Sequence, residues 1–197
     1  MTPRRVAPAA AIEVVAALPR ERAVFVGVDG FGGAGKTTLA DRIAARVAGA
    51  VVVHVDDFQG VGGSEWDWDR MRREVVEPLG AGRTARYQVW SWDETEPDGW
   101  AEVPAGSLVV IEGVSATRTE LGAPWDLTVW VDAPIELRRR RTVERDGPDL
   151  QRLWHEVWIP SEERYAAAQR PQERVDLVVD GAMSDGAGRL GDREGDP

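Results

Sequence analysis

Short apolar runs recur along the chain, and longer amphipathic or polar stretches separate them. Continuous apolar runs rich in valine are typical of strands that are buried on both faces of a parallel sheet. Runs of this kind predict five strands, at residues 23–28, 51–55, 107–114, 126–133 and 175–180.

Helical patterns fill most of the stretches between these runs. Strands that alternate with helices predict an α/β fold with three layers, in which a central five-stranded parallel sheet carries helices on both faces. Residues 60–68 and 83–104 are expected to be irregular. The predicted helices are residues 9–18, about 35–48, 69–79 with a break near Pro78, 135–146, and part of 151–169.

The chain has 197 residues and no evident linker or internal repeat, so we expect one domain over residues 1–181. Within it, residues from about 135 to 150 are expected to form a lid helix. Residues 182–197 are rich in glycine, aspartate and arginine and are expected to form a disordered tail.

Charge and composition narrow the choice of partners. The formal net charge is −10, and a broad acidic surface repels phosphodiester backbones, so we expect no nucleic-acid partner. No apolar run approaches the ~20 residues of a membrane span, so no membrane partner is expected. The absence of cysteine excludes disulfides and thiolate metal sites and fits a cytoplasmic protein. A homo-oligomer is left open.

A glycine-rich loop follows the first predicted strand, and residues 30–37 match G-x-x-x-x-G-K-[ST]. Glycines let successive backbone N–H groups point at one anion, and the helix that follows adds its positive N-terminal end. Lys36 is expected to reach the β- and γ-phosphates, and Thr37 to bind Mg²⁺. The expected nucleotide-binding residues are Gly30, Gly32, Gly33, Ala34, Gly35, Lys36, Thr37 and Thr38.

Acidic residues end the next two predicted strands. Asp56 follows the second strand and could take a proton from an attacking hydroxyl, hold Mg²⁺, or do both. Glu112 closes the third strand, where a carboxylate could hold Mg²⁺ directly or through water. Because parallel strands present their carboxyl ends at one edge of a sheet, these acids and the glycine loop are expected to meet in one cleft.

An arginine-rich stretch lies in the predicted lid helix. Arg138, Arg141 and Arg145 share one helical face, and arginine binds phosphate through paired N–H groups. A solvated, charged outer face is the alternative. The rings of Tyr87, Trp90 and Trp92 could stack on a flat substrate or anchor a long loop in the core. His54 and His155 are interpreted as structural.

The pieces "GFGGAGKTT", "VDDF", "VVIEGV" and "DAPIELRRRRTVERD" together resemble the uridine kinase family, with phosphoribulokinase and bacterial pantothenate kinase as relatives. The resemblance implies that Asp56 is the base toward a sugar hydroxyl and that Glu112 assists Mg²⁺. It assigns Arg138, Arg141 and Arg145 to the phosphates. Substrate contacts are implied for Phe58, Asp67 or Asp69, Tyr87 and, without the family's histidine, Trp92.

The expected activity is transfer of the γ-phosphoryl group of MgATP to a hydroxyl of a small molecule. A uridine- or cytidine-like nucleoside is the first expectation for this acceptor. Another alcohol remains open, whether pantothenate-like, a sugar phosphate or an antibiotic. A nucleotide-dependent switch without acceptor chemistry is the alternative from another functional class.

Overall fold

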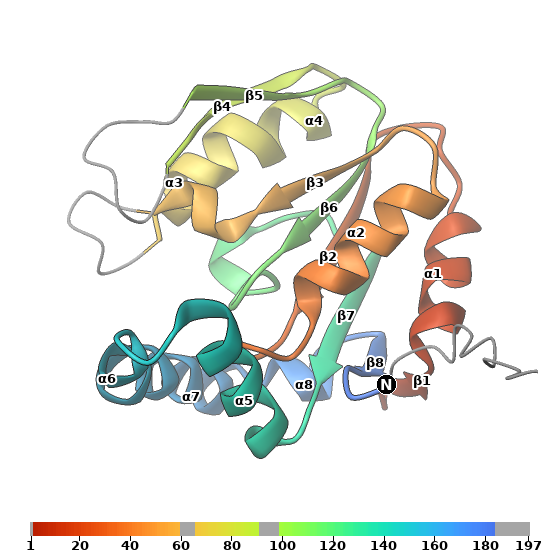
Figure 1. Cartoon of the computed structure of the whole chain (residues 1–197). Helices are drawn as coiled ribbons and strands as arrows, with labels where there is room; N and C mark the ends of the chain where they lie inside the picture. The colour runs from red at the N-terminus through yellow and green to blue at the C-terminus, as the bar shows by residue number, and fades with distance from the viewer. Residues whose placement is uncertain (1, 60–65, 91–98, 184–197) are drawn as a thin grey trace, which may run out of the picture.

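The computed structural model describes residues 2–59, 66–90 and 99–183, and its centre is a parallel sheet of six strands (Figure 1). The strands lie in the order β1-β8-β7-β2-β6-β3. This arrangement confirms the three-layer α/β fold. The strands are β1 (Arg4–Val6), β2 (Val24–Asp29), β3 (Ala50–His54), β6 (Leu108–Glu112), β7 (Leu127–Asp132) and β8 (Leu177–Asp180).

The sixth strand, β1, corrects the prediction of a five-stranded sheet. It pairs in parallel with β8 at the edge of the sheet, with Arg4 opposite Leu177 and Val6 opposite Val179. The strand is only three residues long, and two of them are exposed arginines. An edge strand of this kind lacks the continuous apolar run by which the buried strands are recognised.

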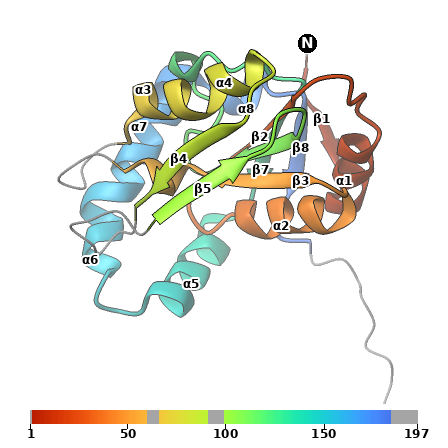
Figure 2. The same ribbon diagram turned by 90° about the horizontal axis from the view of Figure 1, so that it is seen from above.

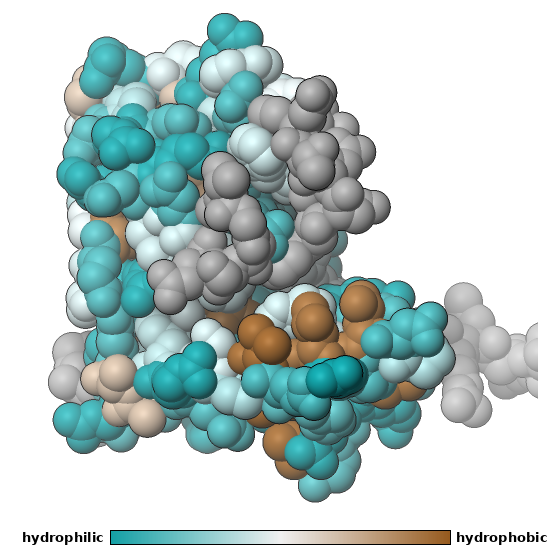
Figure 3. Space-filling model, turned by 90° about the vertical axis from the view of Figure 1, so that its left-hand side faces the viewer, coloured by the Kyte–Doolittle hydropathy of each residue, from teal (hydrophilic) through white to brown (hydrophobic). Residues whose placement is uncertain are grey.

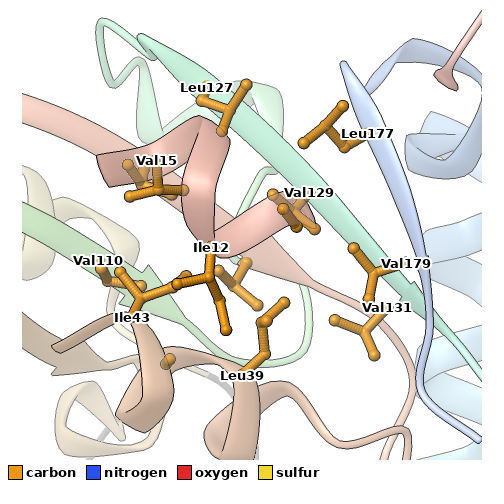
Figure 4. Close-up of a cluster of buried hydrophobic side chains, with 14 of the residues drawn as sticks. Ile12, Val15, Leu39, Ile43, Val110, Leu127, Val129, Val131, Leu177 and Val179 are labelled. Carbon is orange, nitrogen blue, oxygen red and sulfur yellow. The ribbon is translucent and has the colours of Figure 1, made fainter. Parts of the chain in front are cut away.

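One face of the sheet is covered by α1 (Pro8–Ala16) and α2 (Lys36–Arg46). Alternate residues of the central strand, Val24, Val26 and Val28, point to this side because side chains along a strand alternate between its faces. Figure 4 shows Ile12 and Val15 of α1 and Leu39 and Ile43 of α2 among the apolar side chains of the strands. The position of α2 in this core fixes where the glycine loop ends.

The other face is covered by a helical segment and a β-hairpin (Figure 2). The helical segment consists of α3 (Trp68–Met71), η2 (Arg72–Val76) and α4 (Glu77–Gly80), and the antiparallel hairpin of β4 (Ala85–Val89) and β5 (Gly99–Val103). The expectation that residues 83–104 are irregular is therefore wrong where they are described. Polar and apolar residues alternate in β4, and this short pattern was obscured by the acidic, tryptophan-rich residues after it.

The remaining helical segments follow β6 and β7. They are η3 (Thr119–Leu121), α5 (Ile135–Asp146), α6 (Gln151–Leu153), η4 (Trp154–Trp158), α7 (Ile159–Gln169) and α8 (Pro171–Arg174). Apolar side chains gather on part of this surface (Figure 3), where Leu150, Leu153 and Val157 are exposed. No helix in the described ranges is long and apolar enough to cross a bilayer.

Two prolines lie inside continuous helical stretches. Pro78 and Pro160 each come two residues after a five-residue π-helical turn, which spans Arg72–Val76 in one case and Trp154–Trp158 in the other. A wider turn can accommodate a residue that has no N–H to donate. For this reason the helix expected to break near Pro78 continues to Gly80.

Candidate active site

The glycine loop joins β2 to α2 at the carboxyl edge of the sheet. Gly35 stands immediately before the helix with a φ of 103°, a left-handed conformation that side chains disfavour, and Lys36 begins α2. The glycine loop and the N-terminal end of α2 line a cavity of about 610 Å³. Its lining includes Gly33, Gly35, Lys36, Thr37, Thr38, Arg42, Arg141 and Arg145.

Lys36 is mostly buried within this loop. Its Nζ atom donates a hydrogen bond of 3.0 Å to the carbonyl oxygen of Phe31, so the ammonium group is held under the loop. A fixed positive charge beside backbone N–H groups and a helix N-terminus is a site for an anion. The expected phosphate-binding elements are thus brought together.

Thr37 and Glu112 meet at the same edge. The Thr37 hydroxyl donates to Glu112 Oε1 over 3.1 Å, and His54 Nδ1 lies 2.7 Å from the same oxygen. The hydrogen bond to Glu112 raises the pKa of His54. The histidine interpreted as structural is therefore in contact with the carboxylate expected to bind metal.

The donor set at Thr37 and Glu112 fits magnesium. Mg²⁺ prefers oxygen ligands and is usually held in kinases by one or two protein oxygens, with substrate phosphates and water supplying the rest. Among the described residues there is no group of three or more histidine, aspartate or glutamate side chains placed to hold a metal alone. The Thr37 hydroxyl and the buried Glu112 carboxylate, beside the anion site, match a magnesium site that takes only one or two oxygens from the protein.

Asp56 is the second residue of the short helical turn η1 (Val55–Phe58), which directly follows β3. Asp56 is an exposed residue, and Trp66 Nε1 donates a hydrogen bond of 3.1 Å to its Oδ1 atom. Surrounding protein atoms replace much of the remaining water, and this burial raises the pKa of Asp56, while the positive charge of Lys36 opposes the rise. Asp56 therefore lies within electrostatic reach of the anion site.

The neighbouring Asp57 has a different environment. Its Oδ2 atom accepts a hydrogen bond of 3.3 Å from the Tyr87 hydroxyl, and its carbonyl oxygen accepts one of 2.6 Å from Arg70. These contacts tie η1 to α3 and β4. Of the two adjacent aspartates, Asp56 is the exposed one and Asp57 is half-buried.

None of the described residues expected to bind the acceptor, Asp56 included, lines this cavity. Phe58 is fully buried, and its ring centre lies 4.9 Å from that of Tyr87, which is only 3% exposed. Burial also raises the pKa of Tyr87. Asp67 caps α3 by accepting a 2.8 Å hydrogen bond from the Arg70 amide. Trp92 lies outside the described residues.

The arginines of α5 divide into two groups. Arg141 donates to the carbonyl oxygens of Gly33 and Gly181, over 3.2 and 2.9 Å, and it lines the cavity with Arg145. Arg138 does not line this cavity; its guanidinium lies 4.6 Å from the Phe31 ring centre. The side chains expected on one face thus contact different sides of the glycine loop.

Sequence reasoning missed Asp29, the last residue of β2, which is completely buried. Its carboxylate accepts hydrogen bonds from the Gly30 amide at 2.7 Å, from the Thr117 hydroxyl at 2.7 Å and from the Tyr165 hydroxyl at 2.6 Å. It therefore fixes the start of the glycine loop to α7 and to the segment that follows β6. A charged residue closing an apolar strand was the available signal, since such a charge needs partners.

Solved structures with the same fold include a possible uridine kinase from Bacillus stearothermophilus. It has 20% sequence identity and a TM-score of 0.67, with coverage of 88% of this chain and 97% of that one. A candidate fructose transport system kinase from Silicibacter sp. TM1040 has 21% identity and a TM-score of 0.61, with coverage of 88% and 98%.

Curated relatives include the inorganic pyrophosphatases TTM2 and TTM1 of Arabidopsis thaliana, which are 25% and 22% identical. Each match covers 68% of this chain, and the chain spans less than a quarter of each relative's length.

The model of one protein family matches residues 52–158, more than half of the chain. This range begins after the glycine loop and runs from β3, with Asp56 and Glu112, to the arginines of α5 and onward to η4. The likeness therefore covers the elements that follow the glycine loop, and the chain belongs to the Phosphoribulokinase / Uridine kinase family.

Proposed function

We propose that this P-loop kinase transfers the γ-phosphoryl group of MgATP to a hydroxyl group of a small molecule, with Asp56 as the base. The supporting observation is the accessible Asp56 carboxylate at the strand edge that also carries Lys36, Thr37 and Glu112. Partial burial raises the pKa of Asp56, which makes it a better proton acceptor than an ordinary aspartate.

In this proposal the two sides of the site have separate roles. Lys36 and the amides of residues 33–38 bind the phosphates, and Thr37 and Glu112 hold the metal. Bound MgATP supplies the phosphoryl group and a cation that neutralises phosphate charge. Asp56 orients the acceptor hydroxyl and takes its proton, while Arg141 and Arg145 face the cavity to offset negative charge and exclude water.

The class of acceptor is a separate question. A uridine- or cytidine-like nucleoside is the candidate that the family resemblance suggests. The buried positions of Phe58 and Tyr87 remove two of the side chains expected to contact it, and this favours a different alcohol. A non-nucleoside alcohol is therefore the second candidate.

A metabolite screen tests the proposal. ATP consumption would be measured with nucleosides, pantothenate, sugar phosphates and aminoglycosides, each with and without the protein. We expect consumption to depend on one class of alcohol and a phosphorylated product to appear. Nucleotide binding with the same slow hydrolysis in all protein-containing wells, whether or not an acceptor is added, would instead indicate a switch.

A further inference from the structure

Glu162 of α7 lies outside the residues assigned above, yet it contacts the glycine loop. Its side chain is buried, with the residue only 4% exposed, and its Oε1 atom accepts a 3.0 Å hydrogen bond from the Gly32 amide. The Gly32 N–H is thereby directed toward α7. Space is tight at this contact, because a Cβ atom on Gly32 would lie 2.5 Å from the Trp154 ring and 2.8 Å from Glu162 Oε1.

The second carboxylate oxygen of Glu162 is buried and accepts no hydrogen bond. An unsatisfied oxygen of this kind is costly and usually has a functional explanation. The nearest positive group is Arg138, whose Nη1 atom lies 3.9 Å away, beyond hydrogen-bond distance. Lys36 also attracts the carboxylate, and Asp29 repels it.

Arg138 is held from several sides. Its Nε atom donates a 3.3 Å hydrogen bond to the carbonyl oxygen of Ala133, and its guanidinium stacks on Phe31 of the glycine loop. A small movement of α5 would convert the 3.9 Å ion pair with Glu162 into a hydrogen bond. Glu162 is thus the single side chain in contact with both the loop amide and this arginine among the residues described.

From this geometry we infer that Glu162 is a positioning residue for phosphoryl transfer, which fixes the Gly32 peptide with one carboxylate oxygen and orients Arg138 of α5 with the other. This inference rests on the proposed kinase function. Glu162 does not contact the substrate in this inference. It influences phosphoryl transfer through the glycine loop and through Arg138.

Two substitutions separate the two contacts. Glu162→Gln keeps an oxygen for the Gly32 amide and removes the negative charge that faces Arg138, whereas Glu162→Ala removes both. Glu163→Gln is the matched control, because it changes the same charge on the adjacent, exposed position of α7.

Hydrogen exchange at the Gly32 amide reports the loop contact without any turnover. We expect exchange about tenfold faster in Glu162→Ala, because a hydrogen bond to a charged group is lost, and near-normal rates in Glu162→Gln and Glu163→Gln. Equal exchange in all of these proteins would overturn the loop contact. This measurement keeps its meaning even if the acceptor screen finds no substrate.

Turnover reports the contact with Arg138. We expect Glu162→Gln to lower kcat by about tenfold with KM for ATP within about threefold, because Arg138 packs on Phe31 and its displacement would misplace the glycine loop that holds the phosphates. In a protein that already carries Arg138→Gln, Glu162→Gln should change kcat by less than about twofold, because the arginine through which Glu162 acts is no longer present. Equal losses in both backgrounds, or a wild-type kcat in Glu162→Gln, would overturn the inference.

Discussion

In the proposed function, the phosphate side of the site comprises the glycine loop and the start of α2, and the acceptor side comprises Asp56 and its neighbours. The two sides use different kinds of groups. Lys36 and Thr37 lie in the first turn of α2, and their partners Phe31 and Glu112 lie within hydrogen-bond distance. On the acceptor side, Asp56 is accessible, but Phe58 and Tyr87 are packed in the core.

This difference reflects which groups contact the ligand. An anion is bound largely by main-chain N–H groups, whose directions follow from the glycine spacing and from the helix that succeeds it. An acceptor is bound by side chains, and their directions depend on strand pairing across the molecule. The local sequence therefore predicts the phosphate side better than the acceptor side.

The largest expected effect concerns Asp56. Asp56→Asn should lower kcat by about 10²-fold or more, because the amide cannot take a proton, while binding of MgATP is retained. Asp57→Asn is the matched control, and its kcat should stay within a few-fold of wild type. Steady-state kinetics together with nucleotide titration would check both. Similar losses in the two variants would remove the distinction between the adjacent carboxylates.

The next effect concerns the metal on the phosphate side. Glu112→Gln keeps one acceptor oxygen for the shared contact with Thr37 and His54 and loses the charge that attracts Mg²⁺. We expect the Mg²⁺ concentration for half-maximal turnover to rise by about tenfold or more. The measurement is a Mg²⁺ titration at fixed ATP. An unchanged half-saturation point would exclude Glu112 from the metal site.

A smaller effect should separate core packing from substrate contact on the acceptor side. Tyr87→Phe removes the hydroxyl that donates to Asp57 and keeps the ring against Phe58. We expect the free energy of unfolding to fall by about 1 kcal/mol and KM for the acceptor to stay unchanged. Urea unfolding and acceptor titration would check this. A large rise in KM with normal stability would return Tyr87 to the substrate site.

The smallest effect is expected for Glu120, which lies outside both sides of the site. It concerns the pH dependence of stability and serves as a comparison for the site residues. The Gln169 amide donates to it over 2.6 Å and lowers the pKa of Glu120 to about 2. Because the folded pKa lies below the usual 4.5, this stabilisation is present above pH 4.5 and is lost as the pH falls toward 2.

Solvent screening around this exposed carboxylate should keep its contribution below about 1 kcal/mol. The difference in unfolding free energy between wild type and Glu120→Gln should therefore shrink over the same pH range. A difference that grows on acidification would contradict the assigned cause.

Much of the fold could be predicted from the sequence because the buried strands carry continuous apolar runs. β1 escaped prediction because two of its three residues are arginines, and β4 because its alternation is short. In the site, the glycine spacing and the acids at strand ends gave Lys36, Thr37, Asp56 and Glu112. Asp29 and Glu162 could not be assigned their distant partners, because the contacts of Asp29 with Thr117 and of Glu162 with Gly32 join residues more than 80 positions apart.

The walls of the cavity have a practical consequence for protein engineering. Pro8, just after β1, and Met183, just after β8, both line it together with the glycine loop. Shortening the chain far enough to remove Pro8 or Met183 would therefore change a wall of this cavity, even though the glycine-loop motif stays intact. Expression boundaries for this kinase should be compared by ligand-induced thermal stabilisation before any catalytic result is interpreted.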